Sequence, residues 1–207
     1  MSSYKVTIID LLRHGEPEGG SKFRGSLDDP LSELGWEQMR NCLGAKYPWQ
    51  SIVSSPLRRC HDFARELAQK SNIELDVIND LREISFGSWE GMTSQQVMDE
   101  DSDLLRAFWQ DPMKNTPPQG EALTQFASRV ENAWQLLLSS YCGEHLMLVC
   151  HGGTIRVILT YILNMPLDAL WKIEVPFANI SRIRVSQFED GSTTASLVFH
   201  QARLTLD

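Results

Sequence analysis

The chain has 207 residues, of which 42% are hydrophobic and 22% are charged, as is typical of a globular protein that buries one good core. Its net charge of −8 argues against nucleic-acid binding, because that function needs a basic surface. No apolar run approaches the roughly 20 residues that span a bilayer, so we expect a cytoplasmic protein with no membrane partner.

Hydrophobic periodicity predicts strands that alternate with helices. An apolar strand at 6–12 is followed by a polar loop at 15–31 and a helix from its N-cap Ser32 to about Lys46. The later elements are a strand at 49–55, a helix with an apolar stripe from Leu57 to Ala68, a short strand at 73–78, helical segments at 93–99 and 102–110, a long helix at 122–137, a strand at 145–150, a helix at 154–163, and strands at 180–187 and 194–201. This order predicts an α/β fold, a three-layer α/β/α sandwich with a mostly parallel sheet. We expect a single domain over 1–207, with a small helical cap within 80–120 and a C-terminal hairpin.

Two histidines follow predicted buried strands. His14 comes after the strand at 6–12 in the sequence Arg13-His14-Gly15, and His151 comes after the strand at 145–150, before Gly152. If these strands are parallel neighbours, both histidines meet at the carboxyl edge of the sheet, where ligands bind in open α/β folds. The glycines after His151 leave backbone N–H groups free at a helix start, which favours an anion. A strand-capping arginine and a structural histidine are the alternative interpretation.

Four motifs occur in a fixed order: Arg13-His14-Gly15, Ser54-Ser55-Pro56-Leu57-Arg58, Leu81-Arg82-Glu83 with Gly87-Ser88-Trp89-Glu90-Gly91, and His151-Gly152-Gly153. Together they resemble the histidine phosphatase (phosphoglycerate mutase-like) superfamily, and most closely its α-ribazole phosphatase-like branch. The resemblance covers about Val6 to Phe177. It implies that His14 becomes phosphorylated, and that Glu83 protonates the leaving alcohol and then activates water.

The residue types fit phosphomonoester cleavage. Arg13 and Arg58 can hold phosphoryl oxygens through bidentate hydrogen bonds, and a neutral His14 can attack phosphorus. His151 would hold the transferring group, and Gly25 and Gly152 are further expected to bind substrate. Because arginines and histidines supply the positive charge, we expect a metal-independent enzyme without a cofactor.

Several features favour a phosphatase over a mutase. The stretch Pro17-Glu18-Gly19-Gly20 lacks the Asn that is common in related mutases, and their long basic insertion is absent. We therefore expect a small phosphorylated metabolite with one phosphate and a neutral body. α-Ribazole 5′-phosphate, in cobalamin nucleotide-loop assembly, is our first choice. A broad-specificity sugar or nucleotide phosphatase is the alternative, and a homodimer is left open.

Three other functions match parts of the sequence. Cys150 and Arg156 have the Cys-x5-Arg spacing of protein tyrosine phosphatases, although a buried structural thiol explains Cys150 equally simply. A metal hydrolase would use His14, His151 and Glu83, but no metal-binding spacing supports it. The four cysteines show no Cys-x-x-Cys spacing, so we assign no disulfide and no zinc site. A non-catalytic phosphate-binding regulator is the third alternative.

Overall fold

The computed structural model describes residues 4–44 and 47–202. Within them, six strands form one sheet in the order β3-β2-β4-β1-β5-β6. The strands are β1 (Tyr4–Arg13), β2 (Ser51–Ser54), β3 (Leu75–Val77), β4 (His145–Cys150), β5 (Ile180–Phe188) and β6 (Thr193–Ala202). The first four are mutually parallel, while β5 runs antiparallel to β1 and β6 antiparallel to β5. The predicted mostly parallel sheet with a C-terminal hairpin is confirmed.

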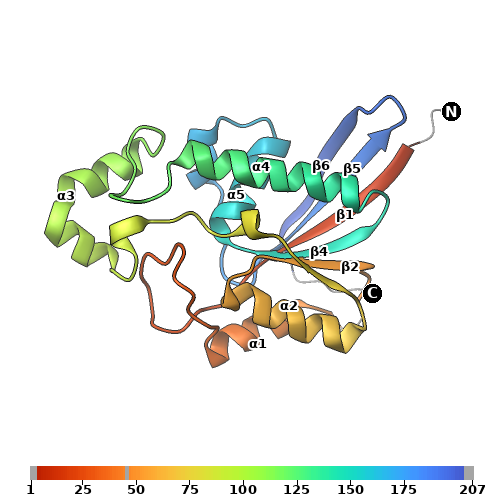
Figure 1. Cartoon of the computed structure of the whole chain (residues 1–207), viewed down its shortest axis with the longest axis horizontal. Helices are drawn as coiled ribbons and strands as arrows, with labels where there is room; N and C mark the ends of the chain where they lie inside the picture. The colour runs from red at the N-terminus through yellow and green to blue at the C-terminus, as the bar shows by residue number, and fades with distance from the viewer. Residues whose placement is uncertain (1–3, 45–46, 203–207) are drawn as a thin grey trace.

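Helices cover both faces of the sheet. Figure 1 shows α1 (Glu33–Cys42) and α2 (Arg58–Ser71) on one side, and α4 (Leu123–Ser140) and α5 (Gly152–Ile162) on the other. Two apolar clusters result: one joins β1 and β4 to α4 and α5, and the other joins the opposite face of these strands to α1 and α2. The predicted three-layer sandwich is therefore confirmed. None of the described helices is both long and apolar enough to cross a lipid bilayer.

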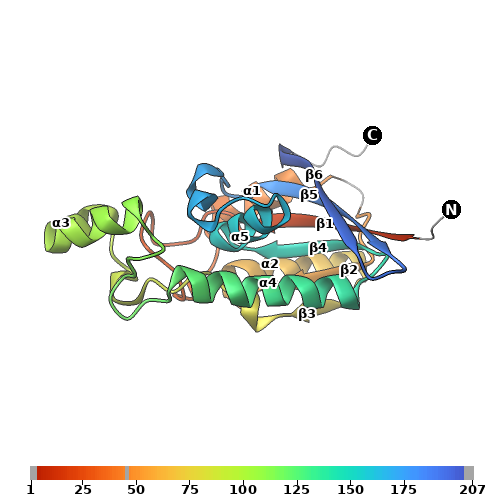
Figure 2. The same ribbon diagram turned by 90° about the horizontal axis from the view of Figure 1, so that it is seen from above.

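A smaller helical unit lies at one end of the sheet. Figures 1 and 2 show α3 (Ser94–Gln110) projecting beyond the end of the sheet that lies opposite the β5–β6 hairpin. Non-helical backbone angles at Asp101 (φ −151°, ψ 80°) kink this helix, which confirms two helical segments that meet near this point. A third apolar cluster, with Phe23, Trp89, Val97, Leu105 and Phe108, packs this unit against the loop before α1. Short 3-10 turns η1 (Asn79–Leu81), η2 (Gly87–Trp89) and η3 (Leu167–Lys172) complete the described elements.

The end of α1 and the start of α5 differ from the sequence expectation for identifiable reasons. The N-cap of α1 is Ser32, as predicted, since its hydroxyl accepts the Gly35 N–H at 3.0 Å, but α1 ends at Cys42 because Leu43 is extended. The predicted end at Lys46 lies outside the described residues. The last helix, α5, begins at Gly152, two residues before the predicted start, because the low helix propensity of glycine hides the first turn.

A buried carboxylate joins three strands at the centre of the sheet. Asp10 on β1 is fully buried and accepts hydrogen bonds from Trp49 Nε1 at 2.8 Å and from Arg182 Nε and Nη2 at 2.7 and 2.9 Å. His145 Nε2, on β4, lies 2.9 Å from the same carboxylate. Burial alone would raise the pKa of Asp10, but hydrogen bonds from His145, Arg182 and Trp49 outweigh it and hold that pKa below its usual value.

We expect Asp10→Asn to lower the free energy of unfolding by about 3 kcal/mol at neutral pH, because Arg182 would lose its buried carboxylate partner. The carboxylate stabilises the fold fully above its unfolded-state pKa of about 3.8 and loses this contribution as the pH falls through the lower folded-state value. Urea denaturation from about pH 7 down to about pH 3 should therefore show the difference between parent and variant shrinking below about pH 4.

The matched control is Asp62→Asn, which removes the partner of the exposed Arg58 and should cost less than about 1 kcal/mol. A difference for Asp10→Asn that is no larger than this control, or that does not change with pH, would contradict the assigned stabilisation.

Candidate active site

The pairing of β1 with β4 brings the two strand-end histidines together. These strands are parallel, with Arg13 opposite Cys150, so the residues that follow, His14 and His151, leave the same edge of the sheet. The His14 N–H donates to the Cys150 carbonyl at 3.0 Å, which extends the pairing by one step. The two imidazole rings lie edge to face, with centroids 5.3 Å apart. The predicted convergence of the histidines is confirmed.

The environment of His14 fixes both its tautomer and its charge. His14 Nδ1 lies 2.7 Å from the Gly15 carbonyl oxygen, and because a carbonyl only accepts, Nδ1 must carry the hydrogen. Burial lowers the pKa of His14 well below its usual value, and the positive charges of Arg59 and Arg13 lower it further. A neutral ring with its hydrogen on Nδ1 keeps a lone pair on Nε2. Such an imidazole is able to attack phosphorus.

Two arginines surround His14. Arg13 donates through Nη1 to the Val175 carbonyl, and the fully buried Arg59 donates through Nη2 to the Gly25 carbonyl at 2.8 Å. Each keeps a buried Nε that has no hydrogen-bond acceptor among the described residues. Burial lowers the pKa of Arg13 to about 10, which still leaves it charged at neutral pH. The two guanidinium groups therefore supply positive charge and unused donors beside the neutral imidazole.

The expectation that Arg58 accompanies Arg13 is wrong by one residue. The Arg58 side chain is 55% exposed, lies 3.5 Å from Asp62 on the same helix, and does not line the cavity beside His14. The neighbouring Arg59 lines that cavity instead. Successive helical residues point about 100° apart, and Arg59 shares the buried side of α2 with Phe63, four residues later.

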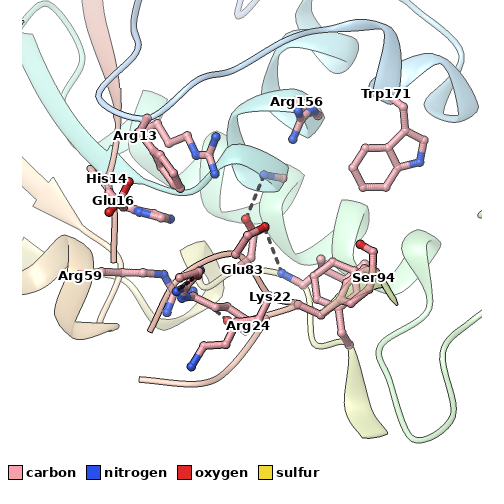
Figure 3. Close-up of a pocket in the computed structure, with 18 of the residues that line it drawn as sticks. Arg13, His14, Glu16, Lys22, Arg24, Arg59, Glu83, Ser94, Arg156 and Trp171 are labelled. Carbon is pink, nitrogen blue, oxygen red and sulfur yellow. Dashed lines mark hydrogen bonds between the residues drawn. The ribbon is translucent and has the colours of Figure 1, made fainter. Parts of the chain in front are cut away.

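Glu83 reaches the same cavity from the loop between β3 and α3. Its carboxylate accepts the N–H groups of Gly153 and Ile84, each at 3.1 Å, which the dashed lines in Figure 3 mark. A Cβ on Gly153 would lie 2.2 Å from Glu83 Oε1, so this close approach requires glycine. Arg129 Nη2 donates to the Glu83 backbone carbonyl at 3.0 Å and holds the loop in place. The structure thus brings Glu83 to the site, as the motif predicted.

His151 is adjacent to His14 but does not line the cavity. It is fully buried, and its Nε2 lies 2.7 Å from Ser55 Oγ. Burial lowers the pKa of His151 well below its usual value, with a further contribution from Arg59, so this ring is neutral as well. His151 therefore contacts the ring of His14 but does not reach the cavity, and its expected role of holding the transferring group stays a prediction.

The cysteine mechanism would need an activated thiol at Cys150. Cys150 is fully buried, and burial raises its pKa well above the usual value, so it is a neutral thiol. Arg156 lines the cavity, whereas Cys150 does not. The metal-hydrolase alternative lacks a ligand set: within residues 4–44 and 47–202, no three His, Cys, Asp or Glu side chains are grouped to hold a metal ion.

The cavity has a volume of about 430 Å³ and a strongly cationic lining. Its charged lining residues are Arg13, Glu16, Lys22, Arg24, Arg59, Glu83 and Arg156 (Figure 3). Gly25 lines the cavity, as predicted. Gly152 lies next to the Arg13 side chain but does not line the cavity. Sequence reasoning missed Lys22 and Arg24 as site residues, and it considered Arg156 only in the cysteine alternative. Arg156 could have been found, because it lies one helical turn after the glycines of the last motif.

Comparison with known proteins places the chain in a family. A model of the histidine phosphatase superfamily (branch 1) matches residues 9–198, and the chain belongs to this superfamily. A bifunctional protein of Mycobacterium tuberculosis is 30% identical over 198 residues, which make up 93% of this chain and 53% of that protein. The chain thus spans about half the length of this relative.

Two further proteins match over most of their length. The adenosylcobalamin/alpha-ribazole phosphatase of Escherichia coli is 27% identical over 181 residues, which cover 86% of this chain and 89% of the relative. The structure of a mycobacterial glucosyl-3-phosphoglycerate phosphatase superposes with a TM-score of 0.84 at 27% identity, and covers 96% of this chain and 100% of that one. The fold is therefore shared with this phosphatase over 96% of the chain.

We expect Arg59→Met to reduce kcat/KM for p-nitrophenyl phosphate by about 100-fold or more, because a buried donor group beside His14 is lost. Arg58→Met is the matched control and should stay within about twofold of the parent, since its side chain points to solvent. Arg59→Lys, with thermal unfolding measured for every variant, separates a loss of guanidinium geometry from misfolding. A larger loss in Arg58→Met than in Arg59→Met would restore the original assignment.

Proposed function

We propose that this chain is a phosphomonoesterase that acts on a small phosphorylated metabolite through a phosphohistidine intermediate on His14. The observation that carries the proposal is the neutral, buried His14, with its Nε2 lone pair free and with Arg13 and Arg59 beside it. Membership of the histidine phosphatase superfamily supports the same reaction class.

In the first step, His14 Nε2 attacks phosphorus and the ester P–O bond breaks. Arg13 and Arg59 stabilise the charge on the nonbridging oxygens. Glu83 enters this step as the neutral carboxylic acid, donates its proton to the leaving alcohol oxygen and becomes a carboxylate. In the second step, water attacks phosphorus, the P–N bond breaks and the water proton passes to Glu83. Inorganic phosphate is released, and both His14 and Glu83 return to their starting states.

The proposed chemistry is metal-independent, because arginine side chains supply the positive charge that phosphoryl transfer needs. We assign His151 a positioning role. It is neutral and buried, and its ring contact with His14, at 5.3 Å between centroids, would hold His14 in its reactive orientation. A non-catalytic phosphate-binding regulator would not need an imidazole held with a free Nε2. Trapping of a phosphoenzyme separates these two functions, because a regulator would form none.

α-Ribazole 5′-phosphate is one candidate substrate. The relative named for this substrate supports it, and Phe86 and Trp109 line the cavity where a heterocycle would pack. The expectation of a neutral body rested on the absent basic insertion, but Arg156 and Lys22 line the cavity and place positive charge there. A phosphomonoester with an anionic leaving group is therefore the second candidate. It matches the cationic lining better.

We expect His14→Ala to lose at least about 1,000-fold in kcat, because the nucleophile is removed. Rapid acid quench of the parent with a ³²P-labelled phosphomonoester should trap an acid-labile phosphoenzyme, and His14→Ala should trap none. Performing the quench after exhaustive EDTA dialysis tests metal independence on the same sample. His61→Ala, on α2 and partly exposed, is the control histidine.

Full activity in His14→Ala together with an inactive Cys150→Ser would establish the cysteine mechanism instead. Activity that disappears on dialysis and returns with one divalent ion would overturn metal independence. A parent that binds phosphate but hydrolyses no ester would identify a regulator.

We expect Glu83→Gln to slow alkyl phosphates by about 100-fold or more relative to p-nitrophenyl phosphate, because only the poor alkoxide leaving group needs a proton. The measurement compares kcat/KM for both substrates within one variant, so a general loss of active protein cancels. Equal losses on the two substrates would show that Glu83 positions the site rather than donating the proton.

A further inference from the structure

Glu90 belongs to one of the sequence motifs but does not line the cavity. Its partly buried carboxylate accepts four hydrogen bonds from two segments of the chain. Oε1 accepts the Ser26 N–H at 2.9 Å, the Phe86 N–H at 3.0 Å and the Ser85 hydroxyl at 3.0 Å, and Oε2 accepts the Ser26 hydroxyl at 2.7 Å. All four donors are neutral. Through these bonds Glu90 joins the loop before α1 to the segment that follows Glu83.

The two segments approach each other most closely at Gly25. A Cβ built on this residue would lie 2.2 Å from Glu90 Oε1 and 2.7 Å from the Ile84 carbonyl oxygen, and its φ of +49° is in the left-handed region. Both features require glycine. A backbone hydrogen bond from the Gly91 N–H to the Phe23 carbonyl, at 2.8 Å, continues the contact. The loop therefore packs directly against the segment that carries the proposed proton donor.

The same stretch of loop supplies the acceptors that hold Arg59. This side chain donates through Nη2 to the Gly25 carbonyl at 2.8 Å and through Nη1 to the Leu27 carbonyl at 2.5 Å. Ser26, which Glu90 binds through both its N–H and its hydroxyl, lies between these two carbonyls in the chain. The direction of the Arg59 guanidinium therefore depends on a loop that Glu90 holds in place.

Glu83 is held by contacts of its own. Its carboxylate accepts the Gly153 N–H at 3.1 Å, and Arg129 donates to its backbone carbonyl at 3.0 Å. Neither contact involves the loop before α1, and Figure 3 shows Arg59 and Glu83 reaching the cavity from different segments. Loss of the Glu90 carboxylate should therefore loosen Arg59 while the proposed proton donor stays in place.

We propose that Glu90 is a positioning residue that fixes the Arg59 guanidinium against the phosphoryl group, through the loop carbonyls to which Arg59 donates. This inference rests on the proposed phosphatase function. Because Glu90 lies outside the cavity lining, it acts through Arg59 and not on the substrate itself. Its effect falls on the transition state, since the charge on the nonbridging oxygens is stabilised best by donors that are held in place before the reaction.

The test measures how orthovanadate, whose five-coordinate adduct resembles the phosphoryl transition state, inhibits turnover of p-nitrophenyl phosphate. We expect Glu90→Ala to raise the inhibition constant of vanadate at least about tenfold, because Arg59 is no longer held toward the equatorial oxygens. An inhibition constant refers only to the folded, active enzyme, so partial misfolding does not change it. Glu90→Gln should stay within about threefold of the parent, because its amide oxygen can accept where Oε1 does and the Ser26 hydroxyl can accept from its amide N–H.

A double variant assigns the effect to Arg59. In an Arg59→Met background, Glu90→Ala should raise the inhibition constant by less than about twofold further, because residues that act through one another are not additive. Glu66→Ala is the matched control. Its carboxylate, on α2, also accepts several hydrogen bonds, including those from Arg40 Nε at 3.1 Å and Nη2 at 2.8 Å, but it does not line the cavity. This control should leave vanadate inhibition unchanged.

Three results would overturn the assignment. An unchanged inhibition constant in Glu90→Ala would show that the loop holds Arg59 without this carboxylate. An equal rise in the parent and Arg59→Met backgrounds would show that Glu90 does not act through Arg59, and a rise in Glu90→Gln as large as in Glu90→Ala would assign the effect to the negative charge instead.

A milder variant keeps the proposal testable if Glu90→Ala does not fold. Ser26→Ala removes only the hydroxyl that donates to Glu90 at 2.7 Å, and it should raise the inhibition constant about threefold. No rise in that variant would also overturn the assignment. Absence of p-nitrophenyl phosphate turnover in the parent would instead contradict the proposed phosphatase function.

Discussion

The site depends on one constraint, the parallel register of β1 with β4. This register sets Arg13 opposite Cys150, and the two histidines therefore leave the sheet side by side. Since side chains alternate between the faces of a sheet, a slip of one residue would send one of these strands' apolar side chains to the wrong layer. Asp10, which is hydrogen-bonded or ion-paired to side chains on β4 and β5, reinforces the same register below the site. Site geometry and sheet stability are therefore two consequences of one strand pairing.

The same pairing explains how two histidines remain neutral among several arginines. Both rings are buried by the strands and helices that meet at the sheet edge, and burial is the largest cause of their lowered pKa values. Neighbouring guanidinium groups act in the same direction, because an imidazolium beside them would be repelled. An arginine, with its much higher usual pKa, stays charged under the same burial. The same buried environment thus leaves His14 neutral and the neighbouring arginines charged.

The sequence was informative where periodicity is strong. The strands that precede His14 and His151, the helical segments of α3 and the terminal hairpin could be predicted from their local sequence patterns. The motif that contains Arg58 failed at side-chain level, since two adjacent arginines satisfy the same pattern. Helical phase distinguishes them: Asp62, four residues after Arg58, is polar, while Phe63, four residues after Arg59, is buried. A motif therefore locates a helix turn, and the apolar stripe of that helix decides which residue faces inward.

The other residues that line the cavity come from segments that periodicity does not describe. Lys22 and Arg24 lie in the loop before α1, and Trp171 lies in η3, between α5 and β5. Their meeting at one cavity depends on tertiary packing, in particular on the aromatic contacts that join the cap to η3. The motif residues, by contrast, are placed by the sheet edge and its flanking helices. Relatives that share the motifs can therefore share phosphoryl chemistry while differing in substrate. In this chain, residues that would distinguish substrates are therefore expected in the loop before α1 and in η3.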